Sequence, residues 1–164
     1  MEPTAMQPND EEIKKAKLKA MNLLKGRDYT ETALRRKLGT CMYSEEAVDA
    51  AVEYVKSYGY VDDLRYAQNY IRSCNGLRSR RDTERRLRDK GVDTELIKEA
   101  FESEGFDEDA EHELIKRLIL KKCYSPEKLD YSGRQKLYAY MYAKGFDIDR
   151  VEKTLNELSL DIIS

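Results

Sequence analysis

The sequence predicts an all-α protein built from tandem three-helix repeats. The 164-residue chain is rich in Ala, Leu, Glu, Lys and Arg, and it has only three prolines and eight glycines, a composition typical of helices. Apolar residues recur at helical spacing between capping residues and glycines. Two stretches of the chain also align with each other at a constant offset. Together these observations predict stacked helical modules.

The internal repeat is seen by aligning the chain with itself. LRDKGVDTELIKEAF, which starts at Leu87, matches MYAKGFDIDRVEKTL, which starts at Met141, without gaps. A period of this length is typical of stacked supersecondary units that each bury part of their core against the next. We predict a disordered tail at 1–9 and three three-helix repeats, which occupy 10–60, 61–105 and 106–164.

Capping residues mark the helices of the first repeat. Acidic residues at 10–12 suit the positive end of a helix that we expect to stop at Gly26. Thr30 and Ser44 then follow as N-caps of two further helices, the second of which ends at 58–59.

The second and third repeats follow the same plan. Either Asp62 or Asp63 starts a helix that ends near 75–76, and an arginine-rich helix runs on to 90–91. The remaining predicted caps are Asp93, Asp107 and Asp147. In the junction at 123–133 the next helix has two alternative starts, at 125–126 or at 130–132.

A Lys-Gly step recurs between helices at Lys90-Gly91 and Lys144-Gly145. A glycine just past a helix adopts the left-handed conformation at little cost, and a lysine in the last turn favours the negative helix end. We therefore interpret both steps as structural turns between two helices.

The composition excludes several classes of protein. Cys41, Cys74 and Cys123 are far apart and form no C-x-x-C pair, which argues against a disulfide framework and a zinc site. The N-terminal residues do not have the pattern of a signal peptide, and no apolar run reaches the length of a membrane span; we therefore expect a soluble, cytoplasmic monomer. His112 is the only histidine and is expected on a helix surface. No nucleophile motif or phosphate loop is visible, so we predict no enzyme, cofactor or metal.

Positive charge is concentrated in the second repeat. Between Arg65 and Lys90, nine basic residues face only three acids, although the whole chain has a net charge of −2. Such local basicity suggests an anionic partner. The predicted contact residues for a partner or DNA are Arg72, Arg78, Arg81, Arg85, Arg88 and Lys90.

Helical geometry assigns the residues of this stretch to an inward and an outward face. At about 100° per residue, Thr83 and Leu87 share an inward face, and four of the arginines (Arg78, Arg81, Arg85 and Arg88) form an outward ridge. Arg80 and Arg86 project differently, and their stems are expected to pack on neighbouring helices. The alternative is an ordinary solvated helix with ion pairs to nearby acids.

Negative charge follows directly along the chain. Ten acids and one lysine occupy the range from Asp93 to Glu113. A solvated face is the default interpretation. Contact with a basic partner, or with the arginines of the second repeat, is the alternative.

One stretch of the chain carries a recognisable motif, Gly59-Tyr60-Val61-Asp62-Asp63-Leu64-Arg65-Tyr66-Ala67. It resembles the central signature of the RecX family of bacterial recombination regulators, G-Y-[LI]-[ND]-D-x-[RK]-[FY]-A. We assign a mainly structural role to its residues Tyr60, Asp62, Asp63, Arg65 and Tyr66. Tyr60, Tyr66 and Ala67 are expected to pack in the core. The segment that follows departs from the family pattern, because Asp82, Thr83 and Arg86 replace its usual basic, isoleucine and glutamate residues.

Both outer repeats extend the resemblance, which spans about 11–158. Residues 27–38 are similar to the family's R-x-[YH]-[ST]-x-x-E-L-x-x-K-L, with Ala33 in place of the glutamate, and 136–146 match its closing repeat. The resemblance implies a curved, elongated array of three-helix repeats without enzymatic activity. It also implies binding to the RecA protein and the RecA–DNA filament, limitation of ATPase and strand exchange, and weak direct contact with DNA.

A second function is kept beside this one. A stand-alone DNA-binding protein would use the arginine-rich helix as a recognition helix. Its affinity would fall steeply with salt, because phosphate contacts release counterions. The net charge of −2 counts against this alternative.

Overall fold

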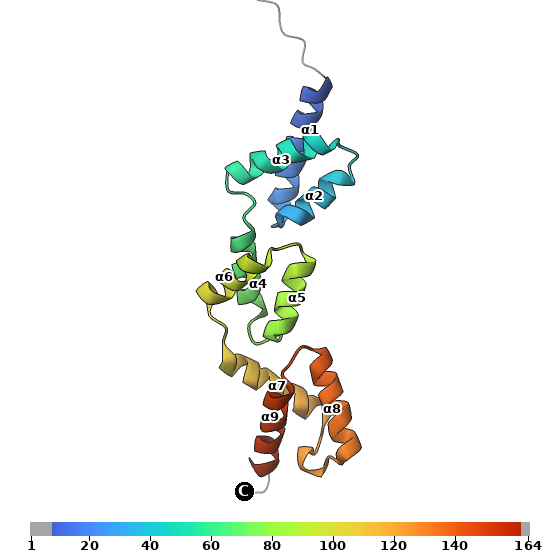
Figure 1. The fold of residues 1–164 in the computed structure, drawn as a ribbon, viewed down its shortest axis with the longest axis vertical. Helices are drawn as coiled ribbons and strands as arrows, with labels where there is room; N and C mark the ends of the chain where they lie inside the picture. Colours follow the sequence, from blue (N-terminus) through green and yellow to red (C-terminus); the bar gives the residue numbers. More distant parts are fainter. Residues whose placement is uncertain (1–7, 162–164) are drawn as a thin grey trace, which may run out of the picture. The chain divides into compact units, whose positions relative to one another are not determined.

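The computed structural model describes residues 8–161, which contain nine α-helices, one short 3-10 helix and no strand (Figure 1). The predicted all-α fold is confirmed. In chain order the elements are α1 (Pro8–Gly26), α2 (Glu31–Gly39), α3 (Glu45–Ser57), α4 (Asp63–Cys74), α5 (Arg80–Asp89), α6 (Thr94–Glu104), α7 (Glu108–Lys122), η1 (Pro126–Lys128), α8 (Tyr131–Ala143) and α9 (Ile148–Asp161). No helix within 8–161 is both long and apolar enough to cross a membrane.

Side-chain caps begin most helices where the sequence predicts them. Carboxylate or hydroxyl oxygens accept backbone N–H groups of the first helical turn at Thr30, Ser44, Asp93, Asp107 and Asp147. Of the two alternatives before α4, Asp62 is the cap, since its carboxylate accepts the N–H of Arg65 at 2.9 Å. In the junction, Asp130 caps α8 at 2.7 Å, whereas 125–126 starts only the 3-10 turn.

One predicted boundary is wrong, and one predicted helical residue, Arg78, lies outside its helix. Pro8 and Asn9 were assigned to the tail but belong to α1, because a proline is tolerated in the first turn of a helix; the rest of the predicted tail lies outside the described residues. The arginine-rich helix begins only at Arg80, because Ser79 caps it by accepting the Asp82 N–H at 3.1 Å.

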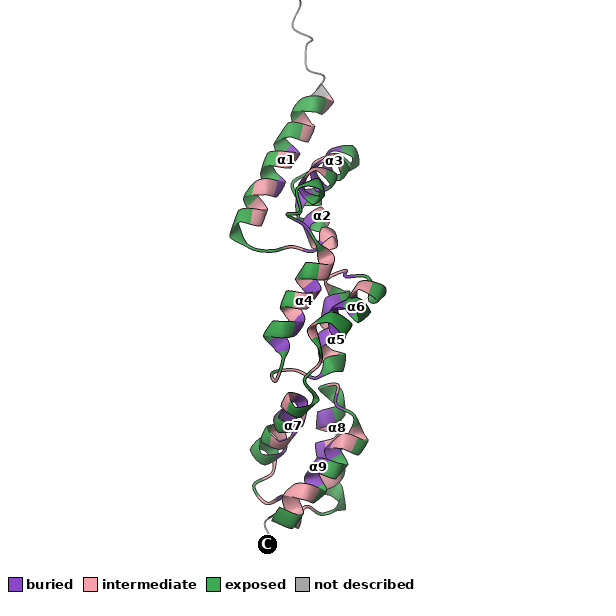
Figure 2. Ribbon diagram, turned by 90° about the vertical axis from the view of Figure 1, so that its left-hand side faces the viewer, coloured by how far each residue is buried: buried purple, intermediate pink, exposed green. Residues whose placement is uncertain are grey.

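The chain divides into two compact units, which we describe separately. The first comprises the chain up to Asn69 together with Leu87–Ala100. Helices α1 and α2 both pack against α3, and the buried faces of these helices enclose a core (Figure 2). Its buried residues are Ala16, Ala20, Leu34, Leu38, Ala47, Val48, Ala51, Val52, Val55 and Val61.

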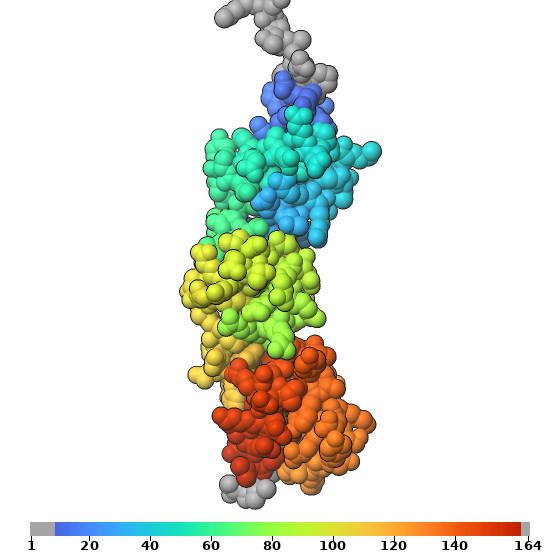
Figure 3. Space-filling model, in the orientation of Figure 1, coloured from blue at the N-terminus to red at the C-terminus, as the bar shows by residue number. Residues whose placement is uncertain are grey.

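The second unit comprises Tyr70–Arg86 and the chain from Phe101 onward. Helix α9 packs against α7, η1 and α8, and α8 and α9 lie side by side in orange and red in Figure 3. Its core consists of Leu114, Ile115, Ile119, Leu137, Met141, Phe146, Val151 and Leu155.

In the first unit, a Lys-Gly turn closes over the start of α2. The hydroxyl of Thr30 donates to the Lys90 carbonyl at 2.6 Å, and the Asp63 carboxylate accepts the Glu31 N–H at 2.8 Å. Gly91 has φ +83°, and a Cβ there would lie 2.4 Å from Cβ of Thr32. The glycine is needed for its backbone conformation and for this close approach.

The second unit repeats this arrangement at the start of α5. The hydroxyl of Ser79 donates to the Lys144 carbonyl at 2.8 Å, and the Glu111 carboxylate accepts the Arg80 N–H at 3.1 Å. Gly145 has φ +87°, and a Cβ there would lie 2.6 Å from the Ser79 hydroxyl. We call each of these arrangements a Lys-Gly joint. Each joint gives the start of one helix hydrogen-bond partners from a later segment of the chain.

Candidate partner-binding surface

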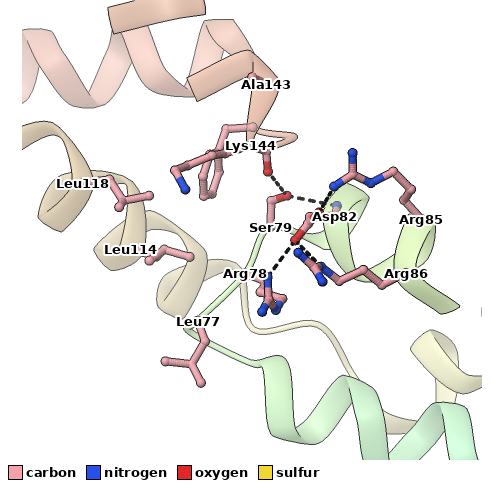
Figure 4. A pocket seen from close by; sticks show the side chains of 11 residues that line it. Leu77, Arg78, Ser79, Asp82, Arg85, Arg86, Leu114, Leu118, Ala143 and Lys144 are labelled. Carbon is pink, nitrogen blue, oxygen red and sulfur yellow. Dashed lines mark hydrogen bonds and ion pairs between the residues drawn. The ribbon is translucent and has the colours of Figure 1, made fainter. Parts of the chain in front are cut away.

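Three arginines converge on one carboxylate in the second unit (Figure 4). Arg78 Nη1 and Arg86 Nε lie 3.2 and 3.0 Å from Oδ2 of Asp82, and Arg85 Nη2 bonds its Oδ1. The Asp82 side chain is only 11% exposed. We call these four residues the Asp82 cluster. It carries three positive charges and one negative charge, and therefore two positive charges in excess.

The local sequence explains why the cluster forms. Asp82 lies three residues after the cap Ser79, in the first turn of α5, where the helix dipole favours a carboxylate. Arg85 and Arg86 follow at spacings of three and four residues, which bring side chains together on a helix. Thr83 and Leu87, on the inward face, are buried as predicted.

The cluster changes the acidity of Asp82. Partial burial disfavours its charged form, but hydrogen bonds from the three guanidinium groups outweigh burial and lower the pKa of the carboxyl below its usual value. A guanidinium carries five N–H donors, and each arginine uses one of them on Asp82. Further donors remain on each arginine for a second oxyanion.

This lowered pKa predicts a specific pH dependence of stability. Because the pKa of Asp82 is lower in the folded than in the unfolded chain, its ionised form stabilises the fold above about pH 4. That contribution is lost as the pH falls through the folded pKa. Urea unfolding at pH values between about 5 and 2 should therefore show a shallower loss for Asp82→Asn than for the unchanged protein. Parallel profiles would contradict the ion pairing described above.

Two shallow hollows adjoin the cluster. The first has a volume of about 240 Å³, and four cationic side chains and one acidic side chain line it. The cationic residues are Arg78, Arg85, Arg86 and Lys144, and the acid is Asp82. The second, of about 140 Å³, is lined by Arg81, Asp82, Arg85, Tyr142, Ala143 and Gly145. The hollows share Arg85 and Asp82, so cationic groups line both.

The four predicted contact residues of the second unit lie at the second hollow, in the Asp82 cluster or in a separate ion pair. Arg81 is exposed beside the second hollow, and Arg85 belongs to the Asp82 cluster. Arg72 lies elsewhere, where its guanidinium makes two bonds, of 3.0 and 2.9 Å, to the Glu104 carboxylate. Arg78 precedes α5 and is therefore not part of a helical ridge, which corrects the prediction; it reaches the same site from the loop.

The last two predicted residues belong to the first unit. Arg88 is exposed in the last turn of α5. Lys90 is half-buried, and its carbonyl is held by Thr30 in the Lys-Gly joint. Of the six predicted contact residues, Arg78 and Arg85 belong to the Asp82 cluster.

Sequence reasoning missed two features of this surface and predicted a third. It counted Asp82 only as one acid among arginines, although the spacing S-x-x-D was a readable capping signal. It gave no role to Tyr142, which is 63% exposed at the second hollow. It expected the stem of Arg80 to pack on a neighbouring helix, and the structure places the guanidinium of Arg80 4.6 Å from the centre of the Phe101 ring of α6.

Three of the five signature residues hydrogen-bond to the backbone of the first unit. Asp62 and Asp63 hold helix starts, and Arg65 donates to the Gly59 carbonyl at 2.8 Å. Tyr66 is half-buried. Tyr60, which we expected to pack, is 49% exposed and lies against the ring of Tyr58 at 6.1 Å between centroids. That expectation was wrong for Tyr60, because the neighbouring Val61 is the residue that enters the core; Ala67 is buried as expected.

Some of the acidic stretch is internally neutralised. Glu104 pairs with Arg72, and Glu111 is buried against Arg150. His112 lies on α7 as expected but is half-buried, and its Nε2 is 3.2 Å from the Glu157 carboxylate. No His, Cys, Asp and Glu side chains within 8–161 are grouped as a metal would require.

Tandem three-helix modules of this kind define a helical-repeat protein. Three models of the RecX family match the chain, namely its first three-helix domain at 16–54, its second at 62–100 and its third at 109–155. Each match falls within one of the predicted repeats. This chain belongs to the RecX family of regulatory proteins.

Relatives support the assignment along most of the chain. The chain is 37% identical over 146 residues to the regulatory protein RecX of Caldanaerobacter subterraneus subsp. tengcongensis, covering 88% of this chain and 71% of the relative. It is 31% identical over 140 residues to that of Trichlorobacter lovleyi, with coverages of 83% and 90%. The crystal structure of RecX from Lactobacillus salivarius has the same fold, with a TM-score of 0.78 at 20% identity over 92% of this chain and 98% of that one.

Proposed function

We propose that this protein binds RecA, chiefly as its filament on DNA, and inhibits its ATPase and strand exchange during DNA repair and recombination. Membership of a family of regulatory proteins supports a regulatory role. The observation that carries the proposal is the Asp82 cluster, whose excess positive charge lies in a protein of net charge −2. A filament on DNA offers both protein carboxylates and phosphates to such a surface.

The double substitution Arg81→Ala/Arg85→Ala tests the proposal. Both side chains are exposed and line the second hollow, and removing the charge-assisted hydrogen bonds they would donate weakens binding. We expect the concentration that halves the DNA-dependent ATPase rate of RecA to rise by about tenfold or more. Unfolding free energy should change by about 0.5 kcal/mol or less per site.

A matched control removes the same charge elsewhere. Lys14 and Lys19 are exposed on α1, so Lys14→Ala/Lys19→Ala should leave inhibition within about twofold of the unchanged protein. Equal weakening by both pairs would show that only net charge matters. A folded wild-type protein that leaves the RecA ATPase rate untouched would contradict the proposed function itself.

Stand-alone DNA binding is the second candidate, favoured by the same excess of arginine. It requires tight binding to duplex DNA without RecA, with a log–log salt slope of about −0.9 for each phosphate contacted. Binding to naked duplex that is much weaker than binding to the filament favours the first proposal.

A further inference from the structure

We infer that the two hollows beside the Asp82 cluster form a track for single-stranded nucleic acid, with phosphates at the arginines and a base stacked on Tyr142. The inference rests on the proposed function for its setting and identifies what the second unit contacts there. The charges of the hollows, the exposed ring and the role of Asp82 support it.

The charges that line the hollows indicate which of them would bind phosphates. Cationic side chains outnumber acids four to one in the first hollow and two to one in the second. A third hollow, of about 260 Å³, continues past Arg81, but its walls carry three acids against two arginines; these are Glu84, Glu111 and Asp147 against Arg80 and Arg81. Phosphates are therefore favoured in the first two hollows and disfavoured in the third.

Two adjacent cationic hollows fit a chain of anions better than a single anion. Arg85 lines both hollows, Arg81 lines the second, and Arg78 and Lys144 line the first. Successive phosphates of one strand could bind at both, and guanidinium groups suit them because they donate paired, parallel hydrogen bonds.

An exposed aromatic ring lies beside the second hollow. Tyr142 is on α8 and is 63% exposed, and neither of the two more exposed tyrosines of this unit, Tyr124 and Tyr131, lines a cationic hollow. A ring next to arginines is the combination by which proteins bind unpaired bases, since every base has a stacking face. Bases in a duplex are not available for such stacking, so the pattern indicates a single strand.

Asp82 acts as an internal counter-ion in this track. Its carboxylate holds Arg78, Arg85 and Arg86 together and occupies donors that an incoming phosphate would otherwise use. It therefore keeps affinity for free strands low while the arginines stay converged. Asp82→Asn keeps the shape of the side chain and removes the competing charge.

The test measures fluorescence anisotropy of a fluorescein-labelled oligothymidylate in the absence of RecA. Tyr142→Ala is expected to weaken binding about tenfold, and Tyr142→Phe to bind as the unchanged protein does. Asp82→Asn should tighten binding several-fold. Arg85→Ala should reduce the log–log salt slope by about 0.7 for each phosphate that the variant no longer binds.

The control is Tyr124→Ala, which removes a fully exposed tyrosine that lines neither hollow. If Tyr142→Ala binds the strand as tightly as Tyr124→Ala, no base stacks there and the inference is overturned. Weaker or unchanged binding by a folded Asp82→Asn variant overturns the counter-ion role. Displacement of the strand by polyglutamate at equal charge, without any effect of Tyr142, indicates an acidic protein segment instead.

Failure of this inference can be separated from failure of the proposed function. The strand assay contains no RecA, and inhibition of RecA ATPase is measured independently on the same variants. Loss of strand binding in a variant that still inhibits fully overturns the track as part of the regulatory complex and leaves the proposed function standing. Strand binding that depends on Tyr142, in an unchanged protein that leaves the RecA ATPase rate untouched, supports the track and contradicts the proposed function.

Discussion

Gly91→Ala is expected to lower the free energy of unfolding by about 3 kcal/mol. Alanine at φ +83° is strained by about 1–2 kcal/mol. Its methyl group would also lie 2.4 Å from Cβ of Thr32, and neither atom can rotate away. The overlap must be relieved by moving the backbone, which breaks the hydrogen bond from Thr30 to the Lys90 carbonyl. Urea unfolding of the full chain measures the loss.

Gly59→Ala separates the two causes of this loss. Gly59 also has positive φ, +70°, but nothing lies within 4 Å of a Cβ built there. It should therefore show only the conformational strain, about 1–2 kcal/mol. Equal losses at the two positions would mean that the contact with Thr32 contributes nothing to the stability of the first unit.

The sequence predicts the parts of each Lys-Gly joint but not their meeting. A cap at Thr30 and a left-handed glycine at 91 both follow from local rules. The hydrogen bond between Thr30 and Lys90 joins residues 60 apart, and the one between Ser79 and Lys144 joins residues 65 apart. Local rules describe a helix and its ends, whereas hydrogen bonds between residues so far apart in the sequence depend on how the helices pack.

Local rules also predicted only part of the candidate surface on α5. Periodicity placed Thr83 and Leu87 inward correctly, because burial of α5 follows its helical face. It placed Arg78 on the ridge wrongly, since the cap at Ser79 starts the helix after that residue. The convergence of three arginines on Asp82 depends on side-chain rotamers, which periodicity does not describe.

Tyr142 shows which part of the surface was beyond sequence reasoning. It lies on α8, far in sequence from α5, and only the fold of the second unit brings it to the hollow lined by Arg81 and Arg85. Read alone, a tyrosine in a helix with several others indicates packing. Its exposure distinguishes it from half-buried neighbours such as Tyr138 and Tyr140.

Arg150→Ala is the second substitution with a large expected effect. The Glu111 side chain is 9% exposed, bonds Arg150 Nη1, and accepts the Arg80 N–H at the start of α5. Removing the guanidinium leaves a buried carboxylate without its counter-charge, which costs about 3 kcal/mol. We expect a loss of this size in urea unfolding of the full chain at neutral pH.

Glu111→Gln and the double variant show whether the unpaired charge is the cause. The amide still accepts the Arg80 N–H, and Arg150, whose side chain is 37% exposed, is left close to water. The single change should therefore cost only about 1 kcal/mol. In Arg150→Ala/Glu111→Gln no buried charge remains, so much of the stability lost in Arg150→Ala should return. The loss of unfolding free energy in the double variant could instead equal the sum of the two single losses. That result would mean that Arg150 acts through packing. Glu111 would then hold the start of α5, and with it the Asp82 cluster, without help from the charge of Arg150.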